Sequence, residues 1–176
     1  TMPQFDLSDL WQCWSDLRHW SRIGMRDLYE NDDTRALLKP EVIWEIERSY
    51  TLTADEIYAA NSVRRRWSRE LDRLFDQYDF LALPTAQVFP FPKDLHWPTE
   101  INGRQMDTYH RWMEIVIAAS LAGIPTINLP VGFDPQGRPM GMQVMGRFGE
   151  DKKVLEFGLA YEGVTEHLSK RPNLIG

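Results

Sequence analysis

The side chains that carry nucleophilic chemistry in this chain of 176 residues do not fall into a catalytic pattern. No Gly-x-Ser-x-Gly elbow occurs, so the usual strand–serine–helix nucleophile is absent from the sequence. Ser120 lies in Ala-Ser-Leu-Ala-Gly. We predict that it is a buried serine whose hydroxyl bonds to its own helix.

The potential metal and redox ligands are equally sparse. His19, His96, His110 and His167 show no ligand-like spacing, which predicts no metal site and no cofactor. The single cysteine, Cys13, lies among tryptophans and is expected to be an inert core thiol. The glycines of residues 137–141 lack the spacing and the lysine of a phosphate loop and indicate a tight hairpin.

Composition and charge narrow the class of partner. The chain has 20 Lys+Arg against 26 Asp+Glu, a formal charge of −6 and 43% hydrophobic residues. This balance argues against broad electrostatic binding of nucleic acid or of an anionic membrane. The longest apolar window, 115–129, is interrupted by polar residues and is shorter than the roughly 18 residues of a membrane span. We therefore expect a soluble, cytoplasmic protein.

The first part of the sequence, residues 1–78, reads as a helical layer. Apolar residues recur every three to four positions from Leu7 to Leu28, which predicts one helical face. Pro40 is placed as a first helical residue. Thr53 and Glu56 have the spacing of a capping box, which predicts that a long helix begins there.

The second part, residues 79–176, reads as an α/β segment. It is expected to contain a strand buried on both faces at 79–83, a long loop at 86–106, a helix at 108–121, strands at 126–131 and 141–146, a Pro-containing turn at 134–137 and a closing helix at 150–166. Three strands do not make a self-sufficient sheet. The sequence thus predicts one incomplete α/β domain, and self-association is expected to cover its apolar surface.

Several segments in order resemble the C-terminal part of the amidase signature enzymes. Tyr78 to Thr85 is similar to the family's element of Tyr-Asp, an apolar strand and Pro-Thr. Pro98 to Gly103, followed by Tyr109 and Trp112-Met113, resembles one branch of the family. Leu121 to Pro125 with Leu129 to Gly132, and then Gly137 to Gly146, are similar to its "LAGxP…xPxG" and "GxPxGxQxxG" stretches.

The resemblance implies the C-terminal portion of the α/β amidase signature fold, with a partial mixed sheet flanked by helices. It also implies hydrolysis of amides through a Ser–Ser–Lys triad that lies upstream of the matching part. Because this sequence contains no Gly-Ser-Ser-Gly stretch, no catalytic residue is assigned. The chain is then expected to be a C-terminal fragment that is inactive alone, with the N-terminal catalytic portion of a parent amidase as its partner. A non-catalytic interaction module that reuses the same half-fold is the alternative.

The resemblance also suggests a substrate class. Glutamine-using members hold the amino acid with an Arg and an Asp. Aligned through Leu121 to Pro125, the Asp position falls at Met113, and the Arg position falls near Trp44 or Glu45. Trp44, Tyr109, Trp112 and Met113 are therefore predicted to contact a small apolar or aryl amide substrate. For Tyr109 and Trp112, a plain core role remains open.

Overall fold

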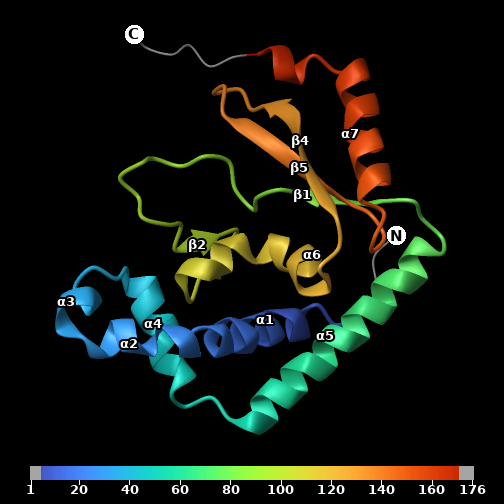
Figure 1. The fold of residues 1–176 in the computed structure, drawn as a ribbon. Coiled ribbons are helices and arrows are strands. Elements are labelled where there is room, and N and C mark those ends of the chain that lie inside the picture. Colours follow the sequence, from blue (N-terminus) through green and yellow to red (C-terminus); the bar gives the residue numbers. More distant parts are fainter. Residues whose placement is uncertain (1–4, 171–176) are drawn as a thin grey trace. The chain divides into compact units, whose positions relative to one another are not determined.

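The computed structural model describes residues 5–170. It divides into two compact units, and the boundary between them falls inside one long helix. The units are Thr1–Glu70 and Leu71–Gly176, and the helix is α5 (Ala54–Phe75). This boundary lies before residue 78, where the sequence places the end of the helical layer. The elements of each unit are labelled in Figure 1.

The first unit is built from helices. They are α1 (Ser8–Ser21), the 3₁₀ turn η1 (Ile23–Met25), α2 (Arg26–Glu30), α3 (Asp32–Arg35), α4 (Pro40–Ser49) and the first part of α5. The predicted single face from Leu7 to Leu28 is wrong, because α1 ends at Ser21 and both of these leucines are exposed. Gly24, a poor helix former, lies in the 3₁₀ turn that follows.

A buried carboxylate joins α1 to α4. Glu45 on α4 is 1% exposed and accepts a hydrogen bond from Arg18 Nε at 2.7 Å and another from Arg22. The ring atom Nδ1 of His19 lies 3.0 Å from the carbonyl oxygen of Glu45, and burial lowers the pKa of this histidine. Breaking a buried ion pair on one side costs about 3–5 kcal/mol, so the two arginines are what make this burial of charge tolerable.

Local start signals in the first unit are confirmed. Helix α4 begins at Pro40. The Glu56 N–H donates to Thr53 Oγ1 at 3.2 Å, and the Thr53 N–H donates to Glu56 Oε2 at 2.8 Å. This reciprocal capping box satisfies two amides that the first turn of α5 would otherwise leave without partners.

The second unit contains a small antiparallel sheet in the order β1-β5-β4. Its strands are β1 (Leu81–Pro84), β4 (Thr126–Phe133) and the central β5 (Pro139–Met145). Helix α7 (Asp151–Val164) packs against β4, and the short η3 (His167–Ser169) follows it. The predicted α/β class, a partial sheet flanked by helices, is confirmed. Every strand pair within residues 5–170 is antiparallel.

Strand β1 differs from its prediction. It pairs with β5 alone among the described residues, and its side chains alternate between half-buried and exposed. The apolar run at 79–83 therefore does not form a strand that is buried on both faces here. The turn at 134–137 is confirmed, since the Gly137 N–H donates to the Asp134 carbonyl at 2.9 Å and Gly137 has a φ of +78°.

The predicted loop at 86–106 contains a hairpin of two short strands, β2 (Glu100–Ile101) and β3 (Arg104–Gln105). Its turn is Asn102-Gly103, with φ values of 50° and 78°. Asn-Gly is the preferred dipeptide of this turn type, so the hairpin had a local signal.

The predicted helix at 108–121 is two elements, the 3₁₀ helix η2 (Tyr109–Val116) and α6 (Ile117–Ala122). The backbone of Ile115 supplies a reason for the interruption. Its N–H donates to Gln87 Oε1 at 3.1 Å and its carbonyl accepts from Gln143 Nε2 at 3.2 Å. Both groups are thus engaged by side chains outside the helix.

The capping box makes a pH-dependent contribution to stability. The backbone N–H of Thr53, together with Arg48, lowers the pKa of Glu56 from 4.5 to about 2. A carboxyl whose pKa is lower in the folded than in the unfolded chain stabilises the fold at pH values above the unfolded-state pKa. For Glu56 this contribution disappears as the pH falls from 4.5 to about 2. We predict that Glu56→Gln lowers the free energy of unfolding at pH 7 and weakens its pH dependence below 4.5.

Urea unfolding at pH steps from 7 to 2, followed by circular dichroism, measures both effects. Asp55→Asn, an exposed carboxylate in the same helical turn, is the control for the loss of charge at a helix N-terminus. Equal pH profiles for the Glu56 variant and the original chain would refute this role of the cap.

Candidate functional site: a pocket at the end of the sheet

One pocket in the second unit is lined by residues from four places along the chain, and Thr85, Gly123, Ile124 and Gln143 belong to the segments that carried the sequence resemblance. Its volume is about 390 Å³. The end of β1, the η2–α6 connection and the strands β4 and β5 contribute to its wall, which consists of Thr85, Val116, Ala119, Ser120, Gly123, Ile124, Thr126, Asn128 and Gln143. None of these nine residues carries a charge. Segments that are far apart in the sequence therefore build one neutral cavity.

A hydrogen bond across the sheet fixes the polar part of the wall. Thr85 Oγ1 donates to Asn128 Oδ1, and the Thr85 N–H donates to the Gly141 carbonyl at 2.9 Å. A Cβ at Gly141 would lie 2.5 Å from Asn128 Oδ1 and 2.8 Å from Thr85 Oγ1. Glycine is thus required at residue 141 by the close approach of these two side chains.

Gln143, which also lines the pocket, holds three segments together. Its side chain is on the central strand β5 and the residue is 4% exposed. Its Nε2 donates to the Pro84 carbonyl at 2.9 Å and to the Ile115 carbonyl at 3.2 Å. Both amide hydrogens are therefore used, and they tie β1 and the end of η2 to β5.

Ser120 agrees with only part of its prediction. Its Oγ donates to the Val116 carbonyl at 3.1 Å, so the predicted bond to its own helix is confirmed. The residue is exposed and lines the pocket, so its predicted burial is wrong. Helix α6 ends two residues after Ser120, at Ala122. Its C-cap Gly123 has a left-handed conformation with φ 66°, which ends the helix before β4 begins at Thr126.

The four residues predicted to contact substrate lie outside the lining of this pocket. Trp44 is on α4 in the first unit, where its ring packs 4.5 Å from the His19 ring. Tyr109, Trp112 and Met113 are on η2, and all three are half-buried. Their role in binding stays a prediction. The sequence carries no signal for Thr85 or Gln143 as pocket residues beyond their places in the quoted segments, and none for Asn128, which lies between two of them.

Aromatic packing surrounds η2. The Trp112 ring meets Phe91 edge-on at 5.4 Å, and the Tyr109 ring lies 5.6 Å from His96. The indole nitrogen of Trp112 is buried and has no hydrogen-bond partner among residues 5–170. This packing supports the core role left open for Tyr109 and Trp112 as well as a contact with an apolar ligand.

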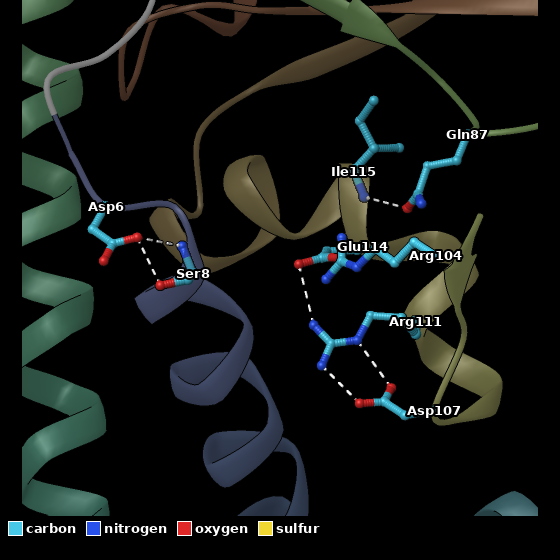
Figure 2. A network of polar contacts seen from close by, with 8 residues as sticks. All are labelled: Asp6, Ser8, Gln87, Arg104, Asp107, Arg111, Glu114 and Ile115. Atoms are coloured by element: carbon cyan, nitrogen blue, oxygen red, sulfur yellow. Dashed lines mark hydrogen bonds and ion pairs between the residues drawn. The ribbon is translucent and has the colours of Figure 1, made fainter. Parts of the chain in front are cut away.

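Ion pairs hold the start of η2, as Figure 2 shows. The Arg111 guanidinium donates to both carboxylate oxygens of Asp107, at 3.0 and 2.9 Å, and pairs with Glu114 at 3.3 Å. Arg104 pairs with Glu114 at 2.9 Å. Hydrogen bonds from Arg111 hold the pKa of the Asp107 carboxyl below its usual range. These charges are satisfied by one another, which is typical of a structural network.

The pocket wall is uncharged and carries one serine, Ser120. Its wall has no lysine or histidine that would activate a serine, and the Ser120 proton is directed at a backbone carbonyl. Across the described residues there is no cluster of three or more side chains able to hold a metal ion, and no helix is long and apolar enough to cross a membrane.

Comparison with known proteins gives the family. The sequence profile of the amidase family matches residues 16–155. The chain belongs to the amidase family. A crystal structure of an amidase superposes with a TM-score of 0.78 and 25% identity, over 91% of this chain and 36% of that one.

Curated relatives in the amidase family carry different names. One subunit of the glutamyl-tRNA(Gln) amidotransferase from Rhizorhabdus wittichii is 35% identical over 167 residues, which is 86% of this chain and 32% of that protein. Fatty acid amide hydrolase of Medicago truncatula is 30% identical over 122 residues, which is 69% of this chain and 20% of that protein. The chain therefore spans a third or less of the length of these amidase relatives.

Gly141, which contacts the Thr85–Asn128 pair of the wall, gives a direct test of the pocket geometry. We predict that Gly141→Ala destabilises the chain by about 1–3 kcal/mol, because the new methyl group overlaps the Thr85–Asn128 pair. Gly163→Ala is the matched control. No described heavy atom lies within 4 Å of a Cβ at this α7 position, so the change is expected to be neutral or to stabilise by up to about 1 kcal/mol.

Urea unfolding of the two variants and the original chain measures the difference. Equal stability of the two variants would contradict the packing described here.

Proposed function

We propose that this chain is the C-terminal, substrate-contacting segment of a longer amide hydrolase whose catalytic serines and lysine lie on the preceding part. The observation that carries the proposal is the neutral pocket, because the family segments build it and it contains no group that activates a nucleophile. On its own the chain would bind without forming a covalent acyl intermediate.

We further propose a small apolar or aryl amide as substrate. Met113 occupies the position at which the resemblance places the carboxylate of the glutamine-using enzymes, and Trp44 or Glu45 lies near that of the arginine. If Trp44 takes the arginine position, this chain has neither of the two charged side chains that would bind the carboxylate and the ammonium group of glutamine. An unpaired charge in a pocket costs several kcal/mol, which is enough to exclude such a substrate.

Tyr109, Trp112 and Met113 lie outside the pocket lining but on η2, whose last residue Val116 belongs to it. These half-buried side chains would offer apolar contact to the part of the substrate that extends beyond the pocket.

The N-terminal portion of the parent is the proposed protein partner. Helix α7 packs against β4 yet exposes Leu155 and Leu159 by 64% and 72%. A helix that is apolar on more than the side it packs with is typical of a buried layer. In the chain alone, the same surface would favour a homo-oligomer.

The absence of a nucleophile is tested with a fluorophosphonate probe of active serines. We expect no labelling of the 176-residue chain by mass spectrometry, since Ser120 has no activating base in the pocket. The longer protein should be labelled once, on a serine outside this segment. Stoichiometric labelling of a serine within the chain would contradict the proposal and favour an independent hydrolase.

The substrate class is tested on the longer protein with a panel of aryl amides, alkyl amides and glutamine. We expect hydrolysis of the apolar amides and little of glutamine. Met113→Asp should lower kcat/KM for the apolar amides by at least about tenfold, because it places an uncompensated carboxylate beside them. Met113→Leu, which keeps volume and polarity, is the control. Efficient glutamine hydrolysis by the unmodified protein would end this assignment.

A further inference from the structure

Five polar side chains line the pocket, those of Thr85, Ser120, Thr126, Asn128 and Gln143. Among their side-chain N–H and O–H donors, only the Asn128 amide is not directed at a residue within 5–170. Thr85 Oγ1 donates to Asn128 Oδ1, and this bond sets the orientation of the Asn128 amide. The Asn128 Nδ2 group donates to no residue within 5–170, and the side chain is exposed in the pocket wall. Asn128 therefore supplies an N–H donor whose direction is fixed by its neighbour.

Ser120 supplies the complementary group. Its hydroxyl proton is directed at the Val116 carbonyl at 3.1 Å. A serine hydroxyl that donates in this way retains oxygen lone pairs as acceptors. Because Ser120 also lines the pocket, its Oγ is available to accept a hydrogen bond from a ligand.

We propose that Asn128 and Ser120 determine selectivity for an uncharged carboxamide. Asn128 Nδ2 donates to the carbonyl oxygen of the ligand, and Ser120 Oγ accepts from its N–H. The apolar remainder of the ligand packs against Val116, Ala119 and Ile124. This assignment deepens the proposed function and rests on it for the identification of the pocket with the substrate side of the enzyme.

The lining explains why charge is rejected. No acidic or basic side chain belongs to the wall, so a carboxylate or an amidinium loses hydration on entry without gaining an opposite charge. A neutral amide loses less hydration free energy on entry, and it regains one hydrogen bond at its carbonyl oxygen and one at its N–H. A volume of about 390 Å³ accommodates a benzene ring with one such substituent.

The test uses three probes of nearly equal shape on the 176-residue chain: benzamide, benzoate and benzamidine. Benzamide is neutral at pH 7, benzoate is an anion and benzamidine is a cation. We expect benzamide to cause saturable shifts in ¹H–¹⁵N correlation spectra at amides around Ser120 and Asn128. Benzoate and benzamidine should bind at least about tenfold more weakly.

Asn128→Asp should change the preferred probe from benzamide to benzamidine. It keeps an oxygen that accepts from Thr85 and replaces the donor with an anionic acceptor. Benzamide affinity should fall by about tenfold and benzamidine should become the preferred probe. Asn102→Asp, the same change at the tip of the β2–β3 hairpin, should leave all three affinities unchanged.

Ser120→Ala keeps the preference for a neutral probe and should weaken benzamide by about three- to tenfold through loss of one acceptor. This variant is the test if Asn128→Asp does not give a folded spectrum. Equal binding of the three probes, binding of none of them, or an unchanged preference in the Asn128 variant would overturn the assignment. Failure of the longer protein to hydrolyse amides, with the exchange of preference observed, would refute the proposed function alone.

Discussion

The side chain of Gln143 sets the geometry on which the second unit depends. Its two donated hydrogen bonds join the last residue of β1 and the end of η2 to the central strand. A buried amide is tolerated only when its polar atoms are satisfied, and loss of the side chain would leave two backbone carbonyls without this donor, at a cost of about 1–3 kcal/mol each. The shape of the pocket follows because these hydrogen bonds fix the positions of the three segments relative to one another.

The wall of the pocket follows from that arrangement. With β1 and β5 in register, Thr85 stands beside Gly141, and the absence of a side chain there lets Thr85 reach Asn128 on β4. One buried amide, one glycine and one threonine therefore orient a polar group without any charge. Such a preorganised neutral site favours ligands that exchange hydrogen bonds and do not carry a charge of their own.

Local features were predictable from the sequence, and features set by distant contacts were not. The predicted capping box of Thr53 and Glu56 needs only neighbouring residues, and it is confirmed. The left-handed helix end at Gly123 is equally local. The interruption of the helix at Ile115 depends on Gln87 and Gln143, each 28 positions away. No periodicity in residues 108–121 carries that information. The hairpin at Asn102-Gly103 did have a local signal, which the Pro-rich surroundings obscured.

The same division applies to the site. Resemblance placed Tyr109, Trp112 and Met113 on one element, and the structure has them together on η2. The Thr85–Asn128 bond spans 43 positions and was not predictable from spacing. The family resemblance covered Thr85, Gly123, Ile124 and Gln143 of the pocket lining, whereas the pairing of Thr85 with Asn128 emerged only from the sheet register.

A crystal structure of the longer protein with a slowly hydrolysed aryl amide bound would show whether this pocket forms the substrate side of an amide hydrolase. We expect the amide group of the ligand within about 2.7–3.2 Å of Asn128 Nδ2, with its ring against Val116 and Ile124. A pocket filled by the protein's own side chains, with the ligand bound elsewhere, would contradict this role of the pocket.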